Sequence, residues 1–440
     1  MFNCSILQET PLTFKEACQV FPGGVNSPVR ACRSVGVTPP IVSSAQGDVF
    51  LDNQGQEFID FCIGWGALIH GHGHPKIVKA IQQGVLKGTS YGLTSEEEIL
   101  FGKMLLSSLK LKEHKVRFIS SGTEATMTAV RIARGITNRP IVIKFIGAYH
   151  GHADTLLESI SINEQTIEKL PLLIEKSSAS PLLLSLPYNN SDILTLVMES
   201  LGSQVAAIIF EPICANMGVV LPQPEFLHHI IELCKRFKSL SIMDEVVTGF
   251  RLGFDGAKTV FNVYPDIIVY GKILGGGMPV AALIAHHLIL DQLMPEGSIF
   301  QAGTMSGNFL AMVAGRTAIE LCQSEGFYSH LNALAKLFYS SIEEAIQSRG
   351  FPVSLVYQGP MFSLFFNESH PRNFDEAKTS NYQLFQKFYQ EVFNNGIFLS
   401  PSPLEASFIS SAHSEENLIY GQNIIIDSLI KIFDSSTKNI

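Results

Sequence analysis

Short apolar runs alternate with helical segments from about residue 95 onward, and this alternation sets the expected architecture. Strands are predicted at 115–119, 140–145, 205–210, 240–243, 266–270 and 279–284. Helices are predicted at 124–135, 224–237 and 311–322. Short apolar strands that alternate with helices are typical of a mostly parallel sheet covered by helices on both faces. The central part of the chain is therefore expected to have an α/β fold.

The two ends of the chain carry different patterns. Residues 1–60 are rich in turns, and alternation at 48–51 and 57–61 predicts a small hairpin. After residue 326, helices predicted at 331–349 and 382–394 flank a strand at 361–366, which indicates an α+β unit. We therefore expect a large domain at 61–325, a small C-terminal domain at 326–440, and an N-terminal segment at 1–60 that packs with the small domain.

One connection in the expected large domain is too long for an ordinary loop. Residues 152–189 form a polar, leucine-rich stretch that contains a Ser-Ser-Ala-Ser run. Long connections without obvious secondary structure are usually functional lids or surface insertions. This stretch is a candidate gating loop.

Composition and charge exclude several classes of function. The 440 residues carry a net charge of −9, which argues against a nucleic-acid partner and against an anionic membrane surface. Seven cysteines are scattered without a CxxC pair, which favours a reducing compartment over a disulfide framework or a zinc site. The N-terminus lacks the pattern of a signal peptide, and the longest apolar stretch, 278–290, is too short to span a bilayer. A cytoplasmic protein is expected.

One lysine occupies an unusual place. Lys272 comes directly after the predicted strand 266–270 and Gly271, and three glycines follow it at 275–277. Most lysines near strand ends are solvated, with a pKa of roughly 10.4 that makes them poor nucleophiles. Burial beside apolar or cationic groups lowers that pKa. Because the glycine backbone also lets a ligand approach closely, we interpret Lys272 as a Schiff-base lysine for pyridoxal phosphate (PLP).

Two further motifs at strand ends suit such a cofactor. Asp244 and Glu245 follow the strand 240–243 at the edge where open α/β sheets bind ligands, and an ionised aspartate there can keep a pyridine nitrogen protonated. Ser120–Glu124 lies between a strand and a helix, where backbone N–H groups point at an anion. Alone, a surface Asp-Glu pair and a plain helix cap are the commoner explanations. Their order along the chain favours a cofactor site.

The histidines raise the question of a metal. Tyr149, His150 and His152 lie together after the strand 140–145, and the tyrosine suits an aromatic ring over a flat cofactor. No carboxylate or cysteine stands at ligand spacing from the two histidines, so we expect no metal site. The three histidines between residues 70 and 74 alternate with glycines, which suits a turn better than a metal cage.

In this order the motifs resemble the class III, fold type I, PLP-dependent aminotransferases. The resemblance covers about residues 21–413, and it implies a PLP-binding large domain with a mostly parallel sheet. A narrower similarity, to a branch in which the amino group moves within one five-carbon substrate, depends on 22–30, 64–66, 211–218 and 400–406. The shared motifs are Ser-Gly-Thr-Glu-Ala (121–125), Tyr-His-Gly-His-Ala-Asp (149–154), Asp-Glu-Val-Val-Thr-Gly-Phe-Arg (244–251), Gly-Lys-Ile-Leu-Gly-Gly-Gly (271–277) and Ala-Gly-Thr-Met-Ser-Gly-Asn (302–308).

The resemblance assigns cofactor-binding roles to residues that match these motifs. Lys272 would be the Schiff-base lysine and proton shuttle, and Asp244 would be the partner of the pyridine nitrogen. The ring would lie between Tyr149 and Val246. The remaining contacts, to the phosphate and the ring region, would come from Gly122, Thr123, Asn216 and, from the second subunit of a homodimer with shared active sites, Thr304.

The resemblance also implies a substrate and a reaction. Arg30, helped by Ser27, would bind the substrate carboxylate, while Trp65 and Glu405 would shape the pocket. The reaction would convert glutamate-1-semialdehyde into 5-aminolevulinate, a tetrapyrrole precursor, through 4,5-diaminovalerate. The cofactor would begin as pyridoxamine phosphate. The upstream glutamyl-tRNA reductase would be a further partner.

The chain departs from the family at three places. Residues 155–163 replace a Gly/Ser-rich gate, Ile146 replaces an acidic residue, and Ala67 replaces a proline. The gate matters because the diamine must not leave midway, and a closing lid slows its release relative to chemistry.

Two alternatives remain at this point. An ω-aminotransferase that uses a separate keto-acid acceptor would share Asp244 and Lys272, so only Arg30, Trp65 and Glu405 separate the two. A non-catalytic PLP-binding regulator would need a DNA-binding module, and neither a basic patch nor a helix-turn-helix pattern is visible.

Overall fold

The computed structural model describes residues 11–157, 159–163, 166–167 and 182–437. Their largest sheet has the strand order β4-β11-β10-β9-β8-β5-β7-β6. Only β11 runs antiparallel to its neighbours, so the predicted mostly parallel sheet is confirmed. In sheet order the strands are His114–Ile119, Ala281–His286, Ile267–Tyr270, Leu240–Glu245, Val205–Phe210, Ile141–Phe145, Leu183–Leu186 and Ile160–Ser161.

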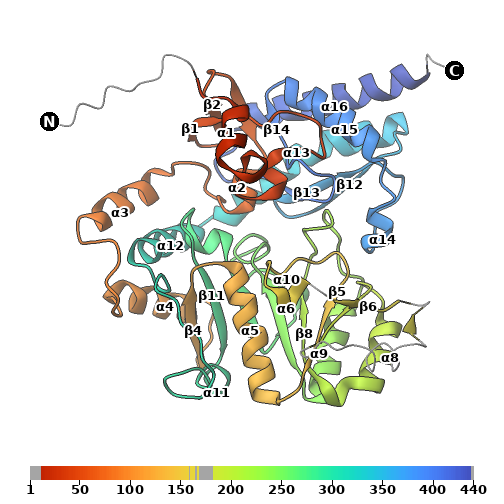
Figure 1. The fold of residues 1–440 in the computed structure, drawn as a ribbon. Coiled ribbons are helices and arrows are strands. Elements are labelled where there is room, and N and C mark those ends of the chain that lie inside the picture. The colour runs from red at the N-terminus through yellow and green to blue at the C-terminus, as the bar shows by residue number, and fades with distance from the viewer. Residues whose placement is uncertain (1–10, 158, 164–165, 168–181, 438–440) are drawn as a thin grey trace.

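Helices cover both faces of this sheet (Figure 1). The side chains of β10 alternate between two cores: Ile267 and Val269 pack with α5, while Ile268 and Tyr270 pack with α4 and α12. Burial on both faces explains why β8 is apolar at every position. The covering helices are α4 (Glu96–Ser108), α5 (Gly122–Thr137), α8 (Ser191–Leu201), α9 (Phe226–Phe237) and α12 (Phe309–Cys322), and α3 (Pro75–Val85) packs on α12.

Two smaller sheets join distant parts of the chain. In the first, β14 pairs in parallel with β3, which brings the C-terminal region beside the N-terminal hairpin β2–β3. Both the hairpin and its position beside the C-terminal region were predicted. The boundaries of the expected domains stay a prediction. The strands of the two sheets are β1 (Val42–Gln46), β2 (Val49–Asp52), β3 (Glu57–Asp60) and β14 (Ile397–Phe398), then β12 (Ser354–Gln358), β13 (Met361–Phe365) and β15 (Ser407–Phe408).

Long helices α13, α15 and α16 pack beside these small sheets (Figure 1). They span Phe327–Arg349, Tyr382–Asn394 and Glu415–Thr437. Among the described helices, none is long and apolar enough to cross a membrane. The shorter helical segments are α1 (Phe14–Val20), η1 (Pro22–Gly24), η2 (Pro28–Ala31), α2 (Ile63–Gly66), α6 (Asp154–Leu157), η4 (Gly202–Gln204), α10 (Ala257–Phe261), η5 (Lys272–Gly275), α11 (His287–Leu290) and α14 (Phe374–Ala377).

The connection 152–189 contains more regular structure than its sequence predicted. It includes α6 and the strands β6 and β7, and β7 is buried and parallel to β5. β7 reads Leu-Leu-Ser-Leu and follows a polar tract, and so short a segment does not show strand periodicity, which is why β7 was missed. Residues 158, 164–165 and 168–181 of the predicted gating loop lie outside the described residues.

Candidate active site

The carboxyl edge of the large sheet gathers polar residues from five strands. The parallel strands β5, β8, β9 and β10 end there, and so does β4, which leads into α5. Such an edge is the usual ligand site of an open α/β sheet. A cavity of about 260 Å³ opens there, lined by Ser121, Gly122, Thr123, Thr126, Tyr149, His150, Gly151, Glu211, Asn216, Asp244, Val246, Val247 and Lys272.

The first turn of α5 forms one end of this cavity. Ser121 is the N-cap, and its side chain accepts a hydrogen bond from the Glu124 N–H at 3.2 Å. The next N–H groups, at Gly122 and Thr123, have no partner within the helix because they lie in its first turn. Gly151 lets the chain pass close to this turn, since a Cβ there would lie 2.5 Å from Thr123 Oγ1. The turn can therefore hold an anion such as a phosphate.

Asp244 is fixed through both of its carboxylate oxygens. Oδ2 lies 2.8 Å from His150 Nδ1, and Oδ1 accepts a hydrogen bond from the Val246 N–H at 3.0 Å. Thr126 Oγ1 donates to the His150 carbonyl at 2.5 Å, which holds the histidine segment against α5. A buried carboxylate oriented in this way suits a charge-assisted bond to a protonated ring nitrogen.

Lys272 lies at the other side of the cavity, in an unusual backbone conformation. Its φ is 46°, in the left-handed region that residues with a Cβ rarely adopt. Burial lowers the pKa of Lys272, and the nearby Arg251 guanidinium lowers it further, while Glu405 and Glu211 act in the opposite direction. A lowered pKa gives a larger fraction of neutral amine, which is the nucleophilic and basic form.

Glu211 is a member of the site that the sequence analysis did not single out. Oε1 accepts from the Tyr149 N–H at 3.0 Å, and Oε2 accepts from the Ala215 N–H at 3.0 Å and from Asn216 Nδ2 at 3.1 Å. Burial raises the pKa of this carboxyl. Like Asp244, Glu211 comes at the end of an apolar strand, so the same sequence signal was present.

His150 and Arg251 were also missed as site residues. His150 was considered only as a metal ligand, whereas its partner here is Asp244. Arg251 is 1% exposed and lies close enough to Lys272 to lower the pKa of the lysine. Among the residues that the structure describes, no group of three or more His, Cys, Asp or Glu side chains could hold a metal ion.

Two of the predicted substrate residues lie near Lys272 without lining the cavity. Burial raises the pKa of Glu405 to about 7, and Lys272 opposes this shift, which places the two side chains within electrostatic reach. Burial raises the pKa of the Cys62 thiol, and the Trp65 backbone N–H and Lys272 both oppose this shift. Trp65 therefore lies on a turn beside the lysine.

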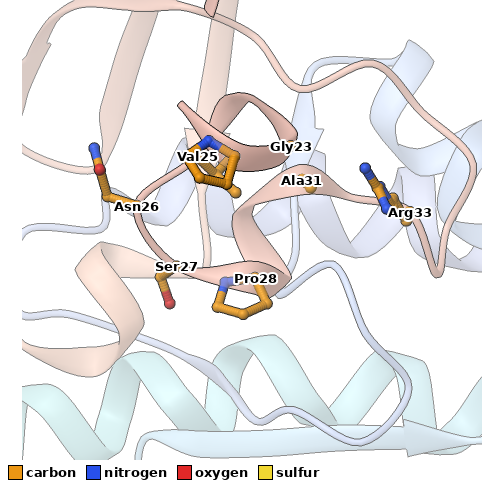
Figure 2. Close-up of a pocket in the computed structure, with 8 residues that line it drawn as sticks. Gly23, Val25, Asn26, Ser27, Pro28, Ala31 and Arg33 are labelled. Carbon is orange, nitrogen blue, oxygen red and sulfur yellow. The ribbon is translucent and has the colours of Figure 1, made fainter. Parts of the chain in front are cut away.

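The remaining predicted residues are not brought into the cavity. Arg30 and Thr304 are exposed in the isolated chain. Ser27 lines a different cavity of about 600 Å³ beside η1 and η2, with Ser27 and Arg33 on opposite sides of it (Figure 2). The cavity at the sheet edge thus contains the predicted cofactor residues Gly122, Thr123, Tyr149, Asn216, Asp244, Val246 and Lys272.

The chain is similar to known proteins over nearly its whole length. A family model for class-III aminotransferases matches residues 32–409. A glutamate-1-semialdehyde 2,1-aminomutase of Chlamydia pneumoniae is 76% identical over 438 residues, which cover 100% of this chain and 99% of that protein. An omega-transaminase structure from Sphaerobacter thermophilus has 26% identity and a TM-score of 0.84, covering 95% of this chain and 96% of that one. A glutamate-1-semialdehyde aminomutase structure from Pseudomonas aeruginosa PAO1, at 23% identity and a TM-score of 0.83, covers 96% of this chain and 94% of that one and shows the shared fold alone.

Proposed function

Because the chain belongs to the class-III aminotransferase family, we propose that it converts glutamate-1-semialdehyde into 5-aminolevulinate for tetrapyrrole synthesis. The reaction moves an amino group between two carbons of one substrate, so it needs no keto-acid acceptor. The observation that carries this proposal is the single cavity that contains Lys272, Asp244 and the first turn of α5. The 76% identity to a named aminomutase supports the same reaction.

PLP fits the donor set of this cavity. Gly122 and Thr123 offer N–H groups for the phosphate, and Asp244 offers a fixed carboxylate for the pyridine nitrogen. Tyr149 and Val246 would hold the ring between them, and Asn216 would contact its edge. When bound, PLP supplies an electron sink for the bond changes at the substrate carbon.

Lys272 is the residue that moves protons in this proposal. Its lowered pKa provides a neutral amine that would accept the proton lost by the substrate carbon that carries the amino group and would return it to the carbon on the other side of the same nitrogen. Asp244 would bind the ring nitrogen, and His150 holds the orientation of that carboxyl group through a 2.8 Å contact. Lys272 and Asp244 thus act on opposite ends of the same cofactor.

The substrate would be held by residues from both ends of the chain. Arg30, with Ser27, binds the carboxylate, because a guanidinium forms paired hydrogen bonds to such a group. Glu405 lies within electrostatic reach of Lys272, where it can orient the substrate ammonium group. Trp65, on the turn beside Lys272, closes the apolar side of the pocket.

The exposed surface near Thr304 supports the proposal of a homodimer. Apolar side chains at Leu86, Leu93, Phe300 and Met305 are 50–86% exposed, and Asn308 Nδ2 bonds to the Thr89 carbonyl, so these two loops lie together. A second copy of the chain would cover them and would place its Thr304 near the phosphate. The outcome is measurable: the purified protein should elute as a dimer. A monomer with full activity would contradict the shared site.

The aminomutase reaction has a direct test. Purified protein supplied with glutamate-1-semialdehyde and no keto-acid acceptor should form 5-aminolevulinate. Failure without an acceptor, followed by transamination once an acceptor is added, would assign the chain to the ω-aminotransferases. The cytoplasmic location and the glutamyl-tRNA reductase partner remain separate predictions, to be tested by fractionation and by co-purification.

A further inference from the structure

The turn Ile63–Gly66, which is α2 in Figure 1, has a left-handed backbone. The φ angles are 46° at Ile63, 58° at Gly64, 59° at Trp65 and 77° at Gly66. Left-handed backbone is unfavourable for residues with a Cβ, and a β-branched isoleucine is especially crowded there. Gly64 and Gly66 adopt these angles readily, but Ile63 and Trp65 do so only when their surroundings hold them.

Asp60 holds the side on which the chain enters this turn. Its Oδ1 accepts hydrogen bonds from the N–H groups of Cys62 at 2.8 Å and Ile63 at 2.9 Å. Its Oδ2 lies 2.8 Å from His72 Nε2, which fixes the orientation of the carboxylate. Asp60 is buried, so these bonds are protected from water. The Asp60 carboxylate thus accepts hydrogen bonds from both N–H groups at the start of the left-handed backbone.

Arg251 holds the side on which the chain leaves the turn. Its Nη2 donates to the Gly66 carbonyl, its Nε donates to the Val247 carbonyl at 2.9 Å, and its guanidinium lies 4.4 Å from the centre of the Phe408 ring. A Cβ on Gly66 would lie 2.7 Å from Arg251 Nη2 and 2.9 Å from the Phe408 ring. The arginine therefore ties the turn to the loop that follows β9.

The burial of Arg251 is difficult to explain by stability alone. The side chain is 1% exposed, and no carboxylate in the described part of the chain forms an ion pair with it. Burying a charge without a counter-ion is costly. Phe250, the residue before it, and Lys272 also have positive φ angles, of 58° and 46°. Strained backbone of this kind gathers at functional sites.

We propose that Asp60 and Arg251 are positioning residues that hold the left-handed turn and thereby place Trp65 at the substrate pocket beside Lys272. The role of Trp65 in that pocket rests on the proposed function. The geometry of the turn does not, because it depends only on contacts within this chain. The two parts can therefore be tested separately.

Trp65 is the only tryptophan in the sequence, so its fluorescence reports on this turn alone. In protein without cofactor, Arg251→Met should shift the Trp65 emission to longer wavelength and increase its quenching by acrylamide. In the loaded enzyme, kcat/KM should fall by about 100-fold, as for an active-site group displaced by about 1 Å. The matched control is Arg139→Met, since Arg139 also donates to backbone carbonyls, those of Gly202, Val205, Phe237 and Lys238. It should leave both the emission and the activity unchanged.

Asp60 provides a second pair of variants, which also covers the case in which Arg251→Met does not fold. Asp60→Ala should move the Trp65 emission in the same direction, whereas Asp60→Asn keeps an oxygen for both N–H groups and should retain the wild-type spectrum. A folded Arg251→Met or Asp60→Ala protein with wild-type emission and kcat/KM overturns the proposal. If the emission shifts but the wild type forms no 5-aminolevulinate, the proposed function fails while the positioning role stands.

Discussion

Replacing Glu211 by alanine should weaken both the fold and the reaction. The carboxylate accepts hydrogen bonds from the N–H groups of Tyr149 and Ala215 and from the Asn216 side chain. Ala215 is buried, and Tyr149 and Asn216 line the cavity. Loss of Glu211 therefore leaves two backbone donors without partners and releases two walls of the cofactor site.

The size of the effect follows from these contacts. An unpaired buried N–H costs about 1–3 kcal/mol, and the partly exposed Tyr149 N–H costs less because water can reach it. Burial raises the pKa of Glu211, so removal of the carboxyl also removes an unfavourable buried charge, which offsets part of the loss. The free energy of unfolding should fall by about 2 kcal/mol. Glu211→Gln keeps one acceptor oxygen and should show a smaller loss.

Urea unfolding followed by circular dichroism measures the change, with kcat/KM for 5-aminolevulinate formation as the second readout. Glu376→Ala is the matched control, because Glu376 also accepts several hydrogen bonds, from Arg372, but its side chain is 35% exposed. Exposed pairs contribute about 0–1 kcal/mol, so this control should change little. The reasoning is refuted if Glu211→Ala unfolds at the wild-type urea concentration and keeps the wild-type kcat/KM.

Two further predictions concern substrate binding and pH. Arg30→Ala should raise KM by about 10- to 150-fold, because a hydrogen bond to a charged group contributes about 1.5–3 kcal/mol. Arg33→Ala is the control and should leave KM unchanged. Equal KM values for the two variants would contradict the role of Arg30 in binding the substrate carboxylate. Burial raises the pKa of Glu405 from its ordinary value of 4.5 to about 7. A raised carboxyl pKa means that the unfolded chain loses its proton first, so this contribution to the free energy of unfolding is complete below pH 4.5 and is lost as pH rises to about 7. Glu405→Gln should reduce the slope measured in urea titrations at several pH values, while Glu245, whose pKa burial also raises to about 7, keeps its own part of it. An unaltered slope would assign it to other groups.

The strand pattern and several residues that line the cavity at the sheet edge could be predicted because their signals are local. Apolar runs such as 205–210 are buried on both faces, and Asp244 and Lys272 follow directly after such runs. Glu211 carried the same signal, but nothing in the sequence alone distinguishes it from a loop carboxylate. Its function depends on the N–H groups of Tyr149 and Ala215, which come from separate segments.

Other features depend on the tertiary structure and have no local signal. The left-handed turn at Trp65 is held by Arg251, which lies 185 residues further along the chain from Gly66. A positive φ angle at a non-glycine residue is imposed by the surrounding structure, because the residue itself disfavours that conformation. Thr304 and Arg30 are exposed in the single chain, and their predicted roles depend on a second subunit or on a bound substrate.

The central claim is that the cavity at the sheet edge holds PLP on Lys272. Borohydride reduction of the PLP-loaded protein, followed by proteolysis and mass spectrometry, tests it most directly. We expect the pyridoxyl label on the peptide that contains Lys272, and Lys272→Ala should lose that label together with several orders of magnitude in kcat while remaining folded. A label on another lysine, or a Lys272→Ala protein that still forms 5-aminolevulinate at the wild-type rate, would contradict the account.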